Sequence, residues 1–344
     1  MGRPARHFLA IVCLLLSGCQ AGYVLKQGWG QLTFSGEQVS LDSPELEETT
    51  TPENLEKLRL VPRILEFCRK ELGLDPGDSY QTYVDTGQEP VSFAVMAAHP
   101  LALIPYQWHF PFVGSVPYKG HFAQEDAREE AERLEELGFE ALVAPVGAFS
   151  TLGWFQDPVL STMLEGNTAD LIDVIIHETT HRTLYFTGAS SFNESLATHM
   201  AREGTVRLLS SDEDLLSELP EYVERKEAHL EREILLLRLQ KDLEALYRSP
   251  ASDADKRVLK SEIFETASAA YRHLLGAKNA SIPVSNAFVL SVARYHEYEP
   301  LLIQLQDTLG GNPADLMAYL KDLPSSEDPI KRIKEEKELK LLVP

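Results

Sequence analysis

Apolar positions along the chain follow first a helical and then a strand-like pattern. Between residues 52 and 73, apolar side chains recur every three to four residues, which predicts an amphipathic helix. The sequence from 91 to 122 is instead rich in aromatic and β-branched side chains and is interrupted by Pro and Gly, as is typical of short strands. The expected strands cover residues 91–98, 101–110 and 113–118.

The helical period returns after this region. A charged amphipathic helix is expected at 125–137 and one further strand at 139–146. Residues 171–176 are apolar except for Asp173, and Asn167 or Thr168 can cap the helix that contains them. We therefore expect a helix that is buried on most sides and runs to about residue 186. The later helices are expected at 193–204, 213–247, 253–275, 286–309 and 313–323, and a loose polar tail at 325–344.

The order of these elements predicts the fold class. Strands precede the buried helix and helices follow it, which is typical of an α+β fold that is predominantly α. The expected division is a strand-containing half at 52–188 and a helical half at 189–344. The chain has 344 residues, enough to bury a large core.

The N-terminus has the pattern of an export signal. Arg3 and Arg6 precede an apolar run at 8–16 that is too short to span a bilayer, which predicts a signal peptide at 1–18. The following sequence, Leu-Ser-Gly and then Cys19, resembles the lipobox of bacterial lipoproteins. By that resemblance Cys19 is acylated and anchors a leader at 19–51 to the lipid bilayer outside the cytoplasm. The alternative is an ordinary secretory signal with a chance cysteine.

Charge and cysteine content narrow the possible partners. The formal net charge is −21, with 53 acidic against 32 basic side chains, and this excess repels the phosphates of nucleic acids and of anionic lipids. Nucleic acid is therefore excluded as a partner. Of the 3 cysteines, only Cys68 would remain unmodified in the mature chain, so no internal disulfide is expected. Cys68 lies on what is expected to be a buried helix face.

The buried helix contains the candidate chemistry. His177 and His181 are four residues apart, so they lie on one helix face and both imidazoles can reach a single metal ion. Glu178 lies beside them, where a carboxylate can take a proton from water. Two capping or surface histidines are the alternative, but buried polar groups need partners, and a zinc ion supplies one.

A third ligand is expected on the next helix, because a zinc peptidase keeps three protein ligands and one open position. Glu194 follows Asn193 at the start of that helix, thirteen residues after His181. An Asn-Glu pair in this position is the arrangement of zinc peptidases with a Glu ligand. His199 is a weaker rival, and Glu194 could alternatively serve only to favour the helix N-terminus.

Several longer segments are more specific than the metal motif. They are WHFPF (108–112), VPYKGHF (116–122), FSTLGWFQDP (149–158), FNES (192–195) and SNA (285–287) leading to Tyr295. With these segments the chain closely resembles a bacterial family of zinc aminopeptidase lipoproteins over most of its length. The resemblance implies a zincin-like fold, a Zn²⁺ cofactor and peptide substrates.

The sequence departs from the family pattern at a few positions. Family members often carry Cys at the positions of His109 and Ser115 and Asn at that of Ser285, and their motif helix commonly reads Glu-Leu-Ala-His. These departures remove no metal ligand.

The resemblance also assigns catalytic roles. In related zinc peptidases a Tyr or His from the later helical region stabilises the oxyanion, and Tyr295 stands at the matching position. Its rivals for this role are Tyr271, His296 and Tyr298. Glu178 is the expected general base.

Substrate contacts are expected next to the metal helix. Residues 149–155 are a candidate edge strand along which a peptide lies, and Asp157 is a candidate to bind its α-ammonium group. An endopeptidase or oligopeptidase with the same chemistry is an alternative, and so is an envelope lipoprotein with a purely structural zinc site. Glu178 favours catalysis, since a structural site has no use for a base.

Overall fold

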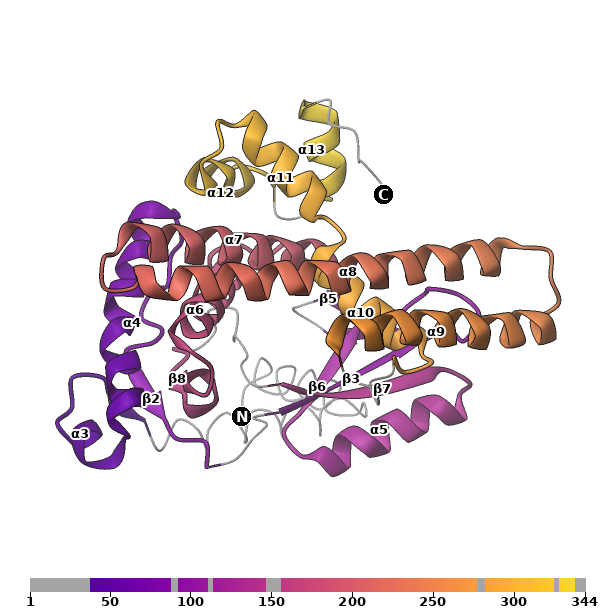
Figure 1. Cartoon of the computed structure of the whole chain (residues 1–344), viewed down its shortest axis with the longest axis horizontal. Coiled ribbons are helices and arrows are strands. Elements are labelled where there is room, and N and C mark those ends of the chain that lie inside the picture. Colours follow the sequence, from indigo (N-terminus) through magenta and orange to yellow (C-terminus); the bar gives the residue numbers. More distant parts are fainter. Residues whose placement is uncertain are drawn as a thin grey trace, which may run out of the picture.

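The structure is a computed structural model that describes residues 38–87, 92–110, 114–146, 156–276, 282–324 and 328–337. Helices predominate, and the described strands form three small sheets (Figure 1). The predicted α+β fold that is predominantly α is therefore confirmed. No helix in the described ranges is both long and apolar enough to cross a membrane.

One sheet has the strand order β6-β3-β7, in which β3 (Ser92–Ala98) pairs antiparallel with β6 (Tyr118–His121) and β7 (Glu140–Val146). Alternate residues of β3 face opposite sides, as the strand period requires. Val95 and Ala97 pack in the apolar cluster that includes α5 (Gln124–Glu136), whereas Met96 and Ala98 pack against Ala287 of α10 (Asn286–His296). In Figure 1, α5 lies along this sheet at the edge of the molecule.

The other two sheets are smaller. β2 (Thr82–Val84) pairs antiparallel with β1 (Val39–Ser40) and parallel with β8 (Val159–Leu160), and β4 (Trp108–Phe110) forms a hairpin with β5 (Gly114–Val116). β1, β2 and β8 were not predicted, because strands of two or three residues are too short to show a period of two.

The helices form the rest of the molecule. α8 (Leu219–Arg248) and α9 (Asp253–Leu275) make a long antiparallel hairpin that extends to one side, and α10 packs on α7 (Ser190–Ser211), α8 and the sheet (Figure 1). The other α-helices of the described residues are α3 (Glu45–Thr49), α4 (Pro52–Glu71), α6 (Thr168–Thr183), α11 (Glu299–Thr308), α12 (Pro313–Lys321) and α13 (Pro329–Lys337).

The largest apolar core surrounds α6. It draws side chains from α4, α6, α7, α11 and α12, so it joins residues on both sides of the predicted boundary at 188. Cys68 lies in this core with no exposed surface, as predicted, and burial raises the pKa of its thiol to about 12. The rigid, apolar surroundings fix the position and rotation of α6.

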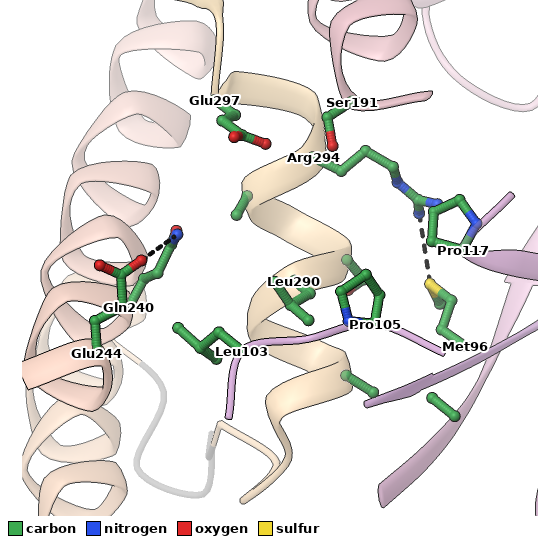
Figure 2. Close-up of a pocket in the computed structure, with 14 residues that line it drawn as sticks. Met96, Leu103, Pro105, Pro117, Ser191, Gln240, Glu244, Leu290, Arg294 and Glu297 are labelled. Atoms are coloured by element: carbon green, nitrogen blue, oxygen red, sulfur yellow. Dashed lines mark hydrogen bonds between the residues drawn. The ribbon is translucent and has the colours of Figure 1, made fainter. Parts of the chain in front are cut away.

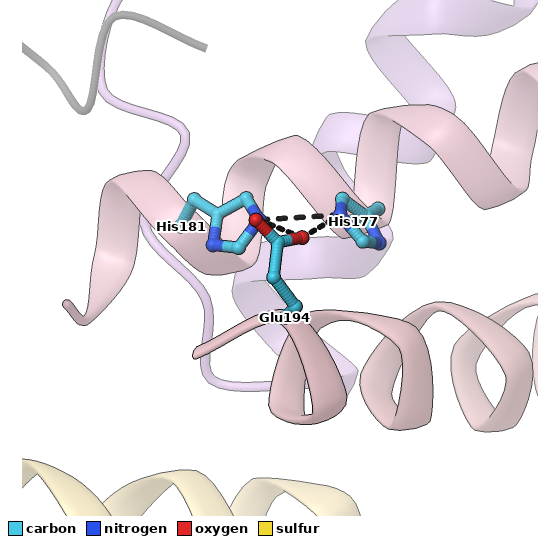
Figure 3. Close-up of side chains that lie close together, drawn as sticks. All are labelled: His177, His181 and Glu194. Atoms are coloured by element: carbon cyan, nitrogen blue, oxygen red, sulfur yellow. Dashed lines mark hydrogen bonds and ion pairs between the residues drawn. The ribbon is translucent and has the colours of Figure 1, made fainter. Parts of the chain in front are cut away.

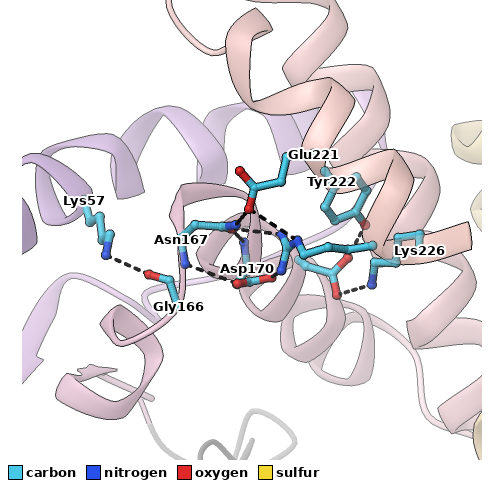
Figure 4. Close-up of polar contacts among 9 residues, drawn as sticks. Lys57, Gly166, Asn167, Asp170, Glu221, Tyr222 and Lys226 are labelled. Carbon is cyan, nitrogen blue, oxygen red and sulfur yellow. Dashed lines mark hydrogen bonds and ion pairs between the residues drawn. The ribbon is translucent and has the colours of Figure 1, made fainter. Parts of the chain in front are cut away.

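Polar contacts fix the N-terminal end of α6 (Figure 4). Asn167 caps the helix by accepting a hydrogen bond from the backbone N–H of Asp170 at 3.0 Å, and the Asp170 carboxylate accepts one from the N–H of Asn167 at 3.1 Å. Arg225 of α8 binds Asp170 at 2.7 Å, and the Lys57 ammonium donates to the carbonyl of Gly166 at 2.7 Å. α4 and α8 are thereby tied to the start of the helix that carries the histidine pair.

Several predicted boundaries were wrong. Only 108–110 of the expected strand 101–110 is extended in a named strand, and the expected helix 286–309 is divided between α10 and α11, whose second residue is Pro300. The tail expected to be loose contains α13, whose Ile333 is fully buried. α6 ends at Thr183 rather than near 186, α7 extends beyond the predicted 193–204 at both ends, and α8 starts at Leu219 rather than at 213.

The predicted edge strand at 149–155, the signal peptide and Cys19 lie outside the described residues.

Candidate metal centre

α6 presents His177 and His181 on one face, as their spacing predicts. Their Nε2 atoms lie 3.2 Å apart, and the ring centroids are 4.8 Å apart with the planes almost perpendicular (Figure 3). Two Nε2 atoms that point at the same space are the donors that a metal ion requires. Two protonated imidazoles would repel each other in this arrangement.

Glu194 completes the group from α7. Its Oε2 atom lies 3.5 Å from the Nε2 of His177 and 3.4 Å from the Nε2 of His181 (Figure 3). Glu194 is the fifth residue of α7 and therefore lies past the first turn of the helix. Its carboxylate contacts the two histidines and does not serve the helix N-terminus. The structure therefore brings together the three residues that were predicted as metal ligands.

The connection between α6 and α7 positions Glu194. Gly188 has a φ of 79°, which favours glycine, and lets the chain reverse between the two helices. Asn193 then closes the turn, because its amide accepts a hydrogen bond from the N–H of Phe186 at 2.9 Å and donates one to the carbonyl of Phe186 at 2.8 Å. The asparagine of the Asn-Glu pair thus holds the loop, and the glutamate reaches the two histidines.

The charges of the three residues act on one another. Burial alone would raise the pKa of Glu194, but His181 and His177 outweigh it and hold the pKa far below its usual range. Burial opposes protonation of His177, and its hydrogen bond to Glu194 still raises the pKa of the imidazole. An anionic carboxylate between two imidazoles is the electrostatic arrangement that a divalent cation stabilises.

Glu178 is buried next to these ligands. Burial raises the pKa of its carboxyl, and the charges of His177, His181 and Glu194 all reach it. The charge of Asp157, the predicted ammonium-binding residue, also reaches Glu178. Asp157 is itself buried, and its backbone is held by hydrogen bonds to Ser79 and Tyr80.

The rival ligand His199 does not join the group. It lies on another part of the surface of α7, where its Nε2 pairs with the Oε1 atom of Gln306 at 2.9 Å. Burial lowers the pKa of this imidazole, and the His199 side chain is buried where α7 meets Gln306 of α11.

Among the candidate oxyanion donors, Tyr295 lies beside the histidine pair. Its ring centroid lies 6.3 Å from that of His177, and burial raises the pKa of its hydroxyl to about 12. Tyr298 instead packs on Phe192, and Tyr271 packs in the separate apolar cluster of α8 and α9. His296 belongs to a second polar cluster, which it forms with Glu233 and Glu299.

Two tyrosines that were not predicted, Tyr185 and Tyr118, also lie near Glu194, and Arg294 lies over the ring of Tyr118. The ring of Tyr185 is 6.4 Å from that of His181, and its position four residues after His181 on the chain was a signal that could have identified it. Burial raises the pKa of Tyr118, and the charges of Glu194 and Arg294 both reach its hydroxyl. No local pattern connects Tyr118 on β6 with α10, so only the folded chain brings Tyr118 and Arg294 together.

A second cluster of titratable side chains lies beside the first. The Nε2 atom of His296 is 3.1 Å from Glu233, and its Nδ1 atom is 3.5 Å from Glu299, which also binds Arg202 at 2.6 Å. These three ligand-type residues could also approach one ion. A pocket of about 250 Å³ connects the two clusters and is lined by His177, Thr198, Arg202, Lys226, His229, Glu233, Tyr295 and His296.

Residues 22–335 match the model of a protein family described as "Putative aminopeptidase". No curated protein and no solved structure matches the sequence.

Proposed function

Because the chain belongs to this aminopeptidase family, we propose that it is a zinc-dependent peptidase that removes N-terminal residues from peptides. One observation carries the zinc dependence: the three donor atoms of His177, His181 and Glu194 are separated by 3.2 to 3.5 Å. Bonds of about 2.0–2.1 Å in a tetrahedron around zinc require donor separations of about 3.3–3.4 Å. Two imidazoles and one carboxylate, with a fourth position left over, are also the donor set of a catalytic zinc site.

The residues divide the chemistry of hydrolysis. When bound, zinc lowers the pKa of water to about 7 and polarises the carbonyl group of the peptide. Glu178 takes a proton from the attacking water and passes it to the amine that leaves when the C–N bond breaks. The raised pKa of Tyr295 keeps its hydroxyl protonated at neutral pH, so it can donate a hydrogen bond to the oxyanion.

The buried position of Glu178 favours catalysis over a structural zinc site. A structural site is closed by four ligands and leaves no use for a base, and burying a carboxylate without need is unfavourable. Glu178 is buried beside the ligands, and its raised pKa suits a group that accepts and releases a proton. An endopeptidase or oligopeptidase would share this chemistry and differ only in where the peptide is bound.

The test combines metal analysis with substrate profiling. We expect the purified protein to bind one equivalent of zinc and to hydrolyse aminoacyl substrates faster than N-acetylated or internally quenched peptides. Glu178→Gln should keep the zinc and reduce kcat about 10²–10⁴-fold, the usual contribution of a general acid–base. Full activity of this variant would assign the base elsewhere, and equal cleavage of N-acetylated peptides would indicate an endopeptidase.

The proposed enzyme acts outside the cytoplasm, held to the membrane through Cys19. The support is the sequence at the N-terminus, where a short apolar run ends in Leu-Ser-Gly and then Cys19. Cys19→Ala should prevent acylation, so the protein should leave the detergent phase on partitioning, while the wild type enters it. If the variant partitioned like the wild type, the anchor would have to be something other than Cys19.

A further inference from the structure

Arg294 differs from the other buried cations of the molecule. Among the described residues, three Lys or Arg side chains are less than 9% exposed: Lys57 at 6%, Lys260 at 4% and Arg294 at 8%. Lys57 binds Glu53 at 2.9 Å and two backbone carbonyls, and Lys260 binds Glu140 and the carbonyl of Pro100. Each ammonium group is therefore paired with a carboxylate and also donates to at least one backbone carbonyl.

Arg294 has no such partner. No carboxylate of the described residues lies within 4.0 Å of its guanidinium, and its Nε is buried without a hydrogen-bond partner there. The guanidinium instead contacts weak partners: the Met96 sulfur at 3.4 Å, the Tyr295 hydroxyl, and the rings of Tyr118 at 4.9 Å and Tyr295 at 5.1 Å. A buried guanidinium without an anion is unfavourable, and aromatic rings offset only part of the loss of hydration. In a chain of net charge −21, a buried arginine would be expected to have a carboxylate beside it, and no described residue supplies one to Arg294.

The guanidinium borders a pocket of about 290 Å³ between α8, α10 and β3 (Figure 2). Its apolar wall includes Met96, Leu103, Pro105 and Leu290. Ser191 also lines this pocket, and in Figure 2 the carboxylates of Glu244 and Glu297 lie on the other side of α10 from the guanidinium of Arg294. The Glu244 carboxylate already forms an ion pair with Arg248 at 3.2 Å and accepts a hydrogen bond from Gln240 at 3.3 Å.

Tyr295 lies between Arg294 and the candidate metal centre. Its ring lies 5.1 Å from the guanidinium carbon of Arg294 and 6.3 Å from the ring of His177. The guanidinium is therefore at most about 11 Å from the His177 ring, a distance that about three extended residues span at about 3.3–3.6 Å each. An anion on Arg294 would thus belong to a residue within about three positions of the bond being cleaved.

We infer that Arg294 binds a carboxylate of the peptide substrate, while the adjacent apolar wall holds the aliphatic part of the same residue. The planar guanidinium can bind a carboxylate through two parallel hydrogen bonds, and Nε is one of the donors that such a pair uses. A C-terminal carboxylate and an acidic side chain share this chemistry. The inference rests on the proposed peptidase function and adds that the enzyme selects short or acidic peptides.

The experiment compares peptides that differ only in charge. The probes are Ala-Ala-Leu, its C-terminal amide, and the pair Ala-Glu-Leu-amide and Ala-Gln-Leu-amide. We expect the wild-type protein to hydrolyse one carboxylate-bearing peptide with a kcat/KM at least about tenfold above that of its neutral counterpart. Preference for free Ala-Ala-Leu assigns the C-terminal carboxylate, and preference for the Glu peptide assigns the side chain. Absence of both preferences overturns the inference without any variant.

Two arginine variants then locate the preference. Arg294→Met should bring the ratio of the two kcat/KM values to about one, and Arg294→Lys should leave an intermediate ratio because the charge remains without the planar donors. The matched control is Arg202→Met, which removes a cation already paired with Glu299 in the other pocket, and this variant should retain the ratio. Loss of the preference in Arg202→Met but not in Arg294→Met overturns the inference. A lower melting temperature and a lower kcat for all peptides, at an unchanged ratio, would likewise leave Arg294 a structural role only.

Binding measurements separate this inference from the proposed function. Calorimetry on zinc-loaded Glu178→Gln protein should give at least about tenfold tighter binding for the carboxylate-bearing peptide, and Arg294→Met should abolish the difference. If the wild-type protein hydrolyses none of the peptides, the peptidase proposal fails, but the binding ratio still decides the role of Arg294. Hydrolysis without any preference or difference in binding refutes Arg294 alone.

Discussion

The molecule contains two neighbouring clusters with similar side chains but different geometry. Each has histidine and glutamate, and one pocket touches both. In the first cluster, both imidazoles and the Glu194 carboxylate direct single atoms at one point, 3.2 to 3.5 Å from one another. In the second, His296 uses its two nitrogens in opposite directions, Nε2 toward Glu233 and Nδ1 toward Glu299.

This difference determines which cluster suits a metal. An imidazole can give only one nitrogen to an ion, so a metal in the second cluster would have to break one of the contacts of His296. Glu299 also binds Arg202 at 2.6 Å, and the positive charges of Arg202 and Lys226 both reach Glu233. Cations beside the carboxylates oppose the binding of another cation. Residue types alone are therefore a poor guide to a metal site, and the direction of each donor atom decides.

The largest expected effect is the loss of zinc when the first cluster is broken. Glu194→Ala removes one of three ligands and should reduce bound zinc from one equivalent to well below one. The part of the stability that zinc supplies is then lost, about 3 kcal/mol at a zinc concentration 100-fold above Kd. The measurements are metal analysis after dialysis and melting curves with and without zinc.

Glu299→Ala is the matched control in the second cluster. It removes a buried carboxylate that holds His296 and Arg202, so the melting temperature should fall equally with and without zinc. Bound zinc should stay at one equivalent. If Glu299→Ala lost zinc and Glu194→Ala did not, the assignment of the two clusters would have to be exchanged.

The next effect concerns Tyr295, which lines the pocket between the clusters. A hydroxyl that stabilises the oxyanion acts mainly in the transition state, so Tyr295→Phe should lower kcat at least about tenfold with little change in KM. A tyrosine with only a packing role would lose at most one hydrogen bond, about 1 kcal/mol, and would show it in the melting temperature. Steady-state kinetics and thermal melting of the zinc-loaded variant distinguish the two roles. Unchanged kcat would shift the role to Tyr118 or Tyr185.

The smallest effect is a pH dependence of stability in the second cluster. Burial raises the pKa of Glu233 above its ordinary value of 4.5, opposed by the charge of His296. The folded protein then binds this proton more tightly than the unfolded chain, so stability falls as the pH rises from about 4.5 through the raised pKa. Glu233→Gln cannot ionise and should lack this part of the slope. The other charged groups that act on Glu233 are Glu299, Arg202 and Lys226.

The melting temperatures of the wild type and of Glu233→Gln, measured in parallel from about pH 4 to pH 8, show how the dependence of stability on pH differs between the two proteins. Glu262→Gln, on the exposed face of α9, serves as the control and should follow the wild type. A Glu233→Gln curve parallel to the wild-type curve at every pH would show that Glu233 titrates alike in the folded and unfolded chains. Zinc content should be unchanged in both variants.

Much of the fold was predictable because helical periodicity is a local property. The bounds of α9 were predicted to the residue, and α4 was predicted to within two residues, because their apolar positions and caps lie within the same short segment. Prediction failed where the deciding contact was remote. α13 carries a charged sequence, yet its Ile333 is buried in a core built mainly from residues far earlier in the chain.

The residues of the candidate site divide in the same way, between those that local spacing predicts and those that only remote contacts bring together. His177 and His181 lie on the same face of one helix because they are four residues apart, so the sequence by itself determined this arrangement. Asn193 and Glu194 could be named from their order, but the hydrogen bonds between Asn193 and Phe186 that direct Glu194 back to α6 exist only in the folded chain. Tertiary structure alone decided that Arg294 lies between Tyr118 and Tyr295, with no carboxylate of the described residues beside it, because these contacts join α10 to a strand more than 170 residues earlier. Periodicity cannot report contacts between segments so far apart, since they arise only when separate elements share one core.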